Sequence, residues 1–266
     1  MPGLQTFHPL WNGKNYHRNS HVQSSAGHEL LDHLRLTGSE KIVDVGCGDG
    51  KISASLSIKA REGSVLAVDL SESMICFAKQ QFPKCDYPNL NFIQGDAAEL
   101  VLVAVYDIIF SCFAIQWLKD PTPFFTKAFE SLAKGGQLVL SIPLDISKAL
   151  EEATAKTCNE CRWHRYFQNF SPGWHFQSPL FYETQVQNKG FTIEYLKVVE
   201  QTIFFKDLAD LKNYIIQWFS YVNAVEQPLQ ESFFDTVMKN YTELTPCKIN
   251  GELPFTFSRI DIIARK

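Results

Sequence analysis

The segment that most constrains the fold is Ile42–Gly50, IVDVGCGDG, where a β-branched run holds an acid and then leads into glycines at every second position. This pattern predicts a buried strand and a tight turn, in which Gly46 and Gly48 let a ligand approach the backbone closely. The helix expected next would offer its N-terminus as a partial positive charge. A strand-to-helix turn without any ligand is the alternative interpretation.

Alternating patterns continue along the chain. We expect strands at 41–45, 64–69, 91–93, 106–111, 137–142, 191–205 and 256–264, and helices at 25–36, 51–60, 72–82, 121–133 and 208–223. Strand and helix in alternation predict a parallel α/β sheet with helices on both faces. Residues 148–185 should form irregular helices. The aromatic-rich chain after residue 148 is typical of a wall for an apolar ligand or of an ordinary core.

The glycine spacing argues against a dinucleotide ligand. Dinucleotide-binding turns use G-x-G-x-x-G, whereas this turn reads G-x-G-x-G with Asp44 just before it. An acid at that position would repel a pyrophosphate but hold an ammonium group. The turn therefore favours S-adenosylmethionine as the cofactor, since this molecule carries an amino group and a sulfonium.

Acids after the next two strands suit the same ligand. Asp69 ends the second strand, where Rossmann-like folds bind both ribose hydroxyls, and a turn or N-cap role is its alternative. Leu70 and Met74 follow and could pack against an adenine ring, although Met74 is better explained as a core residue. Asp96, in the QGDA turn after the third strand, could accept a hydrogen bond from the adenine amino group. A plain turn acid would explain Asp96 equally well.

The fourth strand leads into Ser111–Trp117, SCFAIQW. Ligands in open parallel sheets lie beyond the carboxyl ends of the strands, so Gln116 and Trp117 suit a polar substrate group beside an apolar wall. Trp117 as plain core is the alternative. The segment lacks the Asn/Asp-Pro-Pro-Tyr pattern of enzymes that methylate amide or base nitrogens. The expected cofactor contacts are completed by Cys47, Ala97, Ser111 and Cys112.

In four segments the chain resembles class I S-adenosylmethionine-dependent methyltransferases: VDVGCGDG, VLAVDLSESM, FIQGDAAEL and YDIIFSCFAIQWLKDPTPFFTKAFESLAKGGQLVLSIP. The resemblance implies an α/β fold, a Rossmann-like seven-stranded mixed sheet, mostly parallel with an antiparallel last strand. It also implies one domain over 1–266. Its expected parts are an N-terminal helical segment 1–36, a cofactor-binding core 37–147, a helical aromatic-rich cap 148–190 and 206–250, and final strands 191–205 and 254–266.

Three branches of that family, all of which methylate carboxylates, share further features with this chain. AIQW and the ending PFTFSR…IARK resemble trans-aconitate methyltransferases, although the Arg-Pro pair that opens that branch is missing here. The opening YHRNSHVQ resembles juvenile hormone acid methyltransferases and malonyl-carrier-protein methyltransferases. The juvenile hormone resemblance implies that Gln23 and Trp117 hold the substrate carboxyl, with Gln116 as a weaker candidate. A carrier-protein enzyme would be expected to show a basic face, which the sequence does not reveal.

Two other groups of residues have competing interpretations. Cys158, Cys161 and His164 form C-x-x-C-x-x-H, but zinc would need a fourth ligand such as His175, and we expect no metal. Arg259 on the last strand could meet the second carboxylate of a diacid. A surface ion pair is its more ordinary interpretation.

Composition narrows the functional class. A net charge of −4 over 266 residues argues against a generic nucleic-acid binder. No apolar run approaches the twenty or so residues that a membrane span needs. Seven cysteines without framework spacing, and an N-terminus unlike a secretory signal, fit a cytoplasmic protein. We expect a small carboxylic acid as the substrate, with an idle methyltransferase fold used as a binding partner as the alternative of another class.

Overall fold

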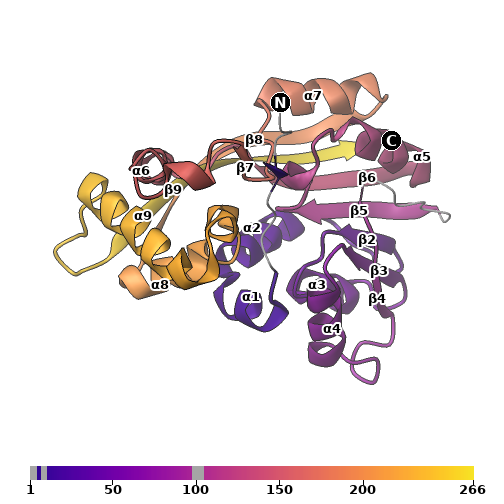
Figure 1. The fold of residues 1–266 in the computed structure, drawn as a ribbon. Coiled ribbons are helices and arrows are strands. Elements are labelled where there is room, and N and C mark those ends of the chain that lie inside the picture. The colour runs from indigo at the N-terminus through magenta and orange to yellow at the C-terminus, as the bar shows by residue number, and fades with distance from the viewer. Residues whose placement is uncertain (1–4, 7–10, 98–104) are drawn as a thin grey trace. The chain divides into compact units, whose positions relative to one another are not determined.

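The computed structural model describes residues 5–6, 11–97 and 105–266. Their main feature is a seven-stranded sheet in the order β4-β3-β2-β5-β6-β9-β8 (Figure 1). The strands from β4 to β6 are parallel, and β9 pairs antiparallel with β6. The expected seven-stranded mixed sheet is confirmed, and its last strand lies inside the sheet, between β6 and β8.

The elements have the following bounds. The strands are β1 Gln5–Thr6, β2 Lys41–Val45, β3 Ser64–Asp69, β4 Leu90–Gln94, β5 Tyr106–Cys112, β6 Leu132–Pro143, β7 Phe170–Ser171, β8 Thr192–Phe205 and β9 Leu253–Arg265. The α-helices are α1 Gly13–Asn19, α2 His21–Asp32, α3 Lys51–Lys59, α4 Glu72–Gln81, α5 Thr122–Ser131, α6 Lys148–Cys158, α7 Pro179–Asn188, α8 Leu208–Ile215 and α9 Gln230–Leu244.

The central strands are apolar on both faces because helices cover both sides of the sheet. Side chains alternate between the two faces along a strand. Ile42 accordingly joins one buried cluster with Val65 and Phe110, while its neighbour Val43 joins a second cluster with Leu138. This burial of neighbouring residues explains why the central strands are mostly apolar on both faces, with Asp44 as a buried exception in β2.

The described residues divide into two compact units. One unit contains the parallel core and consists of Asn12–Leu144, His175–Val199 and Arg259–Lys266. The other contains Asp145–Trp174 and Glu200–Ser258, with the described residues that precede Asn12. Aromatic side chains pack on one another inside the second unit, where the ring centroids of Phe170 and Tyr221 lie 4.4 Å apart.

Several boundaries differ from those expected. Helix α2 begins at His21 rather than Ser25, and the short helix α1 before it was not indicated by the residue pattern, although the resemblance implied a helical segment over 1–36. Helix α5 ends at Ser131, before Gly135 and Gly136, because the backbone already extends into β6 there. The end of the FIQGDAAEL segment, residues 98–100, lies outside the described residues. None of the helices described here is both long and apolar enough to cross a membrane.

Candidate cofactor and acceptor site

The turn after β2 has a backbone that only glycine accommodates. The N–H groups of Gly46 and Cys47 both donate to the carbonyl oxygen of Val68, at 2.8 and 3.0 Å. Gly46 has φ of 76°, and a Cβ at that position would lie 2.2 Å from the Cβ of Ala114. Gly48 also has a positive φ, of 54°. The turn is therefore held close to the end of β3, and the side chain of Ala114 packs directly against Gly46.

Asp69 fastens this turn to the end of β3. One carboxylate oxygen accepts the N–H of Gly48 at 2.9 Å, and the other accepts the N–H of Ser71 at 2.8 Å. Burial raises the pKa of Asp69, and these two hydrogen bonds oppose that shift. The next residue, Leu70, is 66% exposed, whereas Met74 is buried in the core. Leu70 thus offers an apolar surface beside the Asp69 carboxylate, and Met74 does not.

Asp44 is a buried acid directly behind the turn. Its carboxylate accepts a hydrogen bond of 2.5 Å from the Ser53 hydroxyl. Burial raises the pKa of Asp44 to about 7, the charges of Asp69 and Asp49 push it in the same direction, and the Ser53 hydrogen bond opposes them. A cation bound nearby would favour the ionised carboxylate.

A pocket opens at this turn and brings together six of the residues singled out in the sequence. The pocket is lined by Gln23, Asp44, Gly46, Cys47, Gly48 and Cys112. Burial raises the pKa of both thiols well above the ordinary value, so these cysteines remain protonated and unreactive. Ser111 does not line the pocket, and its buried hydroxyl donates to the Val45 carbonyl oxygen at 2.8 Å. Asp96 and Ala97 follow β4 and are half-buried.

Gln23 brings an unpartnered amide atom to this pocket. Its Oε1 is buried and has no hydrogen-bond partner among the described residues. An amide assigned this way can also present its NH₂ group at the same position. The carbonyl oxygen of Gln23 accepts a contact of 3.6 Å from Cys112 Sγ, so α2 packs directly on the end of β5.

The loop after β5 carries the other two predicted acceptor residues. Gln116 is buried and donates from Nε2 to the Phe113 carbonyl oxygen at 2.8 Å, while its Oε1 is buried without a partner in the described part of the chain. Trp117 is half-buried and ends the short 3₁₀ helix Ile115–Trp117. Phe113, at the start of the loop, is the one described non-glycine residue with a positive φ, of 56°. Strain of this kind is often found at functional sites.

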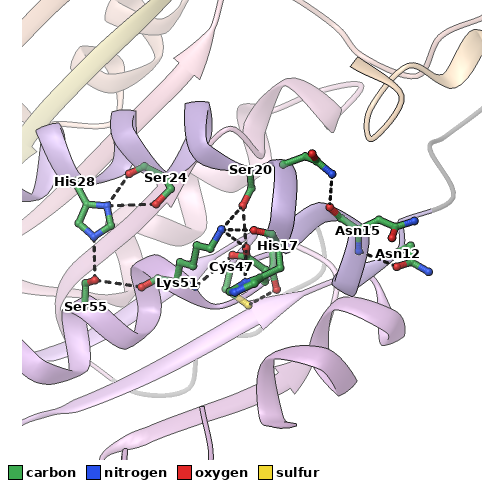
Figure 2. A network of polar contacts seen from close by, with 12 residues as sticks. Asn12, Asn15, His17, Ser20, Ser24, His28, Cys47, Lys51 and Ser55 are labelled. Atoms are coloured by element: carbon green, nitrogen blue, oxygen red, sulfur yellow. Dashed lines mark hydrogen bonds and ion pairs between the residues drawn. The ribbon is translucent and has the colours of Figure 1, made fainter. Parts of the chain in front are cut away.

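Sequence reasoning missed a polar cluster on the pocket's rim (Figure 2). Lys51 Nζ donates to the His17 carbonyl oxygen at 2.5 Å and to Ser20 Oγ at 2.9 Å. It also lies 3.3 Å from the carboxylate of Asp49, which accepts a hydrogen bond from Ser20 Oγ at 2.9 Å. Tyr16 completes the lining on this side. The available signal was Lys51 at the first position of the helix that follows the glycines.

The Cys158–His164 motif and Arg259 were the other two groups with competing interpretations. Among the described residues, no group of three or more His, Cys, Asp or Glu side chains has an arrangement that could hold a metal ion. Arg259 does form ion pairs, but the expected surface location is wrong, because Arg259 is 1% exposed and lies between Asp261 and Glu29. Its guanidinium already binds these two acids.

Comparisons with known proteins agree with this geometry. Residues 42–136 match a family model described as a methyltransferase domain. Protein 235L of Invertebrate iridescent virus 6, a predicted methyltransferase, is 25% identical over 87% of this chain and 85% of its own length. Trans-aconitate 2-methyltransferase of Deinococcus radiodurans is 31% identical, and the match spans 56% of each protein.

A solved structure shares the fold at low sequence identity. Geranyl diphosphate C-methyltransferase of Streptomyces coelicolor A3(2), solved with S-adenosyl-L-homocysteine, has a TM-score of 0.56 and 14% identity, and covers 92% of this chain and 76% of its own. The matched segment holds the glycine turn, Asp69 and Asp96, and the sheet has the order described above. This chain therefore contains a class I S-adenosylmethionine-dependent methyltransferase domain and resembles the trans-aconitate methyltransferases.

Proposed function

We propose that this protein transfers the methyl group of S-adenosylmethionine to a carboxylate oxygen of a small or fatty organic acid. The methyltransferase domain and its cofactor rest on the domain match and on the fold. The carboxylate acceptor rests on the unpartnered amide of Gln23 in the pocket of the glycine turn. The resemblance to enzymes of trans-aconitate supports the same acceptor class.

The residues present fit the cofactor. Gly46 and Gly48 line the pocket without side chains of their own, so a ligand there could approach their backbone, and Asp44 suits the amino group. Asp69 would bind the ribose hydroxyls, as acids at the end of the second strand do in Rossmann-like folds. Asp96 would accept from the adenine amino group, and exposed Leu70 would cover the ring. When bound, this cofactor supplies an electrophilic methyl group on a sulfonium.

Carboxylate methylation needs little proton chemistry from the protein. A carboxylate is already ionised at neutral pH, given a reference pKa near 4, so no general base is required. The main tasks are to align the acceptor oxygen with the methyl carbon and to exclude water, since an anion and a cation combine into neutral products. Gln23 would hold the carboxyl group by hydrogen bonding, Trp117 would pack beside it, and Gln116 would add a second amide.

Gln116 is the weaker of the two amides: its unpartnered Oε1 can only accept a hydrogen bond, so an ionised carboxylate could be held only by its Nε2, which also donates to the Phe113 carbonyl oxygen. Burying a polar atom without a partner costs free energy, and a hydroxyl or other donor on the substrate would offset that cost at the Gln116 oxygen. Malonyl-carrier protein and trans-aconitate remain alternative acceptors of the same chemical class. A fold that binds the cofactor without transferring its methyl group is the alternative of another class.

The test is methyl transfer from labelled S-adenosylmethionine to a panel of free acids, with malonyl-carrier protein included. The panel runs from citrate-like diacids to long apolar monoacids. We expect an alkali-labile product from one acid class. Cofactor binding without transfer to any member of the panel would refute the carboxylate acceptor and favour the idle fold.

Variants locate the acceptor site. Gln23→Leu removes the amide while keeping its bulk, and should lower kcat/KM for the acid by roughly tenfold to a hundredfold while the cofactor still binds. Gln187→Leu is the matched control, because Gln187 lies exposed on α7. Equal activity of the Gln23 and Gln187 variants would exclude Gln23 as the anchor.

A further inference from the structure

A row of polar residues crosses the sheet at the level of the pocket. Cys112 on β5 pairs with Ser141 on β6, and Ser141 pairs with Asp261 on β9. Ser141 Oγ donates to Asp261 Oδ1 at 2.6 Å, and both residues are buried. The row therefore runs through three neighbouring strands from a residue that lines the pocket.

Arg259 extends this row along β9. It precedes Asp261 by two positions, so the two side chains lie on the same face of the strand. Arg259 Nε lies 3.2 Å from each carboxylate oxygen of Asp261. The guanidinium is 1% exposed, and a buried cation of this kind must be paired with an acid to be tolerated.

The row contacts α2 at two points. At one end, Cys112 Sγ donates to the carbonyl oxygen of Gln23. At the other, Nη2 of Arg259 donates to Oε2 of Glu29 in an ion pair. Both contacts fall on the helix that carries the Gln23 amide, and they join it to the strands whose ends form the pocket.

We propose that Arg259, acting through Glu29, is a positioning residue that fixes α2 on the sheet so that the Gln23 amide meets the acceptor carboxylate. This inference rests on the proposed function. Glu29 is the informative residue to replace, because its side chain is 51% exposed and Arg259 stays paired with Asp261 without it. Loss of Glu29 therefore does not leave a buried charge alone.

The first test is a double-mutant cycle between Glu29→Ala and Gln23→Leu. Glu29→Ala alone should lower kcat/KM for the acid by roughly tenfold, with the Kd for S-adenosylmethionine changed by less than about twofold. In the Gln23→Leu background the same change should cost less than about twofold, because the group it positions is already gone. Glu29→Gln, which keeps the hydrogen bond, should restore most of the activity.

Asp32→Ala is the matched control, since it removes an exposed acid from the last position of the same helix. It should behave like the unmodified protein. An equal loss from Glu29→Ala in both backgrounds, or an equal loss from Asp32→Ala, would overturn the positioning role.

A second readout does not depend on catalysis. Hydrogen exchange of the amides of α2 should become faster in Glu29→Ala and stay unchanged in Asp32→Ala. Unchanged exchange in Glu29→Ala would overturn the proposal. If the unmodified protein methylates no acid, the proposed function fails, and this exchange measurement then decides by itself whether Glu29 anchors the helix.

Discussion

At the scale of single residues, Asp44 has a consequence for stability. Its pKa is about 7 in the folded chain and 3.8 as an ordinary aspartate. Between these values the folded state keeps a proton that the unfolded state has released, so the free energy of unfolding falls as pH rises from about 4 to 7. Asp44→Asn should lose this part of the pH dependence and be more stable than the unmodified protein at pH 8 by about 1 kcal/mol or more.

Denaturant unfolding of both proteins across that pH range measures the difference. Asp44→Asn keeps an acceptor for the Ser53 hydroxyl, so its core packing need not change. Parallel pH profiles for the two proteins would contradict the raised pKa.

The same carboxylate should link cofactor binding to pH. A cationic ligand beside Asp44 favours its ionised form, so binding near neutral pH should release a proton and tighten as pH rises from about 6 to 8. Calorimetry with S-adenosylmethionine in two buffers of different ionisation enthalpy counts the released proton. Asp44→Asn should release none and bind more weakly. Proton uptake by the unmodified protein would contradict this assignment.

A glycine can be required because its backbone has a positive φ or because a Cβ would clash with a neighbouring atom, and Gly46 and Gly135 allow the two effects to be compared. Both have a positive φ, but a Cβ on Gly46 would collide with Ala114, whereas a Cβ on Gly135 would meet nothing within 4 Å. Gly135→Ala should therefore cost only the left-handed backbone penalty of about 1–2 kcal/mol. Gly46→Ala should be more destabilising and should abolish cofactor binding, as thermal unfolding with and without the ligand would report. Equal effects of the two variants would contradict the close approach.

At the scale of elements, Lys51 joins the junction of α1 and α2 to the start of α3. Its ammonium group reaches the His17 carbonyl oxygen, the Ser20 hydroxyl and the Asp49 carboxylate. Lys51→Met should therefore speed hydrogen exchange of residues 13–24 and weaken cofactor binding, because the pocket loses one wall. Lys59→Met, an exposed change on the same helix, is the control. Equal exchange in both variants would show that Lys51 does not hold this junction.

The central strands could be predicted because the residues that specify each strand lie within it or in the adjacent turn. The strands at 41–45 and 64–69 have the bounds expected from the sequence, since each is a short apolar run that ends at a turn. Within the helical segment 1–36 that the resemblance implied, the residue pattern did not reveal helix α1. That helix is only seven residues long, and its side-chain cap comes from Asn12, without an apolar stripe beside it. The start of α2 was placed four residues late for a similar reason: His21 begins a polar first turn.

The burial of Arg259 could not be predicted from the residues near it in the sequence. Its burial depends on the pairing of β9 with β6 and on Glu29, which lies 230 positions earlier in the chain. Nothing within a few residues of Arg259 distinguishes a buried arginine from a surface one. The same limit applies to Lys51, whose partners come from the N-terminal helices.

At the scale of the whole molecule, the parallel core and the aromatic-rich unit differ in what they contain. The core contains the glycine turn, Gln23 and Trp117. It also contains residues 42–136, which match the methyltransferase domain model. Rings in the other unit pack into a core of their own, with Trp163 fully buried against Phe233. A role for that unit as a dry cap over the substrate stays a prediction. Removal of an aromatic there should then change which acid is preferred more than it changes cofactor affinity.

A methyl group on a carboxylate oxygen forms an ester, which alkali cleaves, whereas methyl groups on other atoms withstand mild alkali. The most direct measurement is a reaction with trideuteromethyl-labelled S-adenosylmethionine and the acid panel, followed by mass spectrometry before and after mild alkali. We expect one acid class to give a labelled methyl ester that releases deuterated methanol in alkali, and we expect Gln23→Leu to lose this product. A labelled product that survives alkali would place the methyl group on nitrogen, carbon, sulfur or an ether oxygen, and would rule out a carboxylate acceptor.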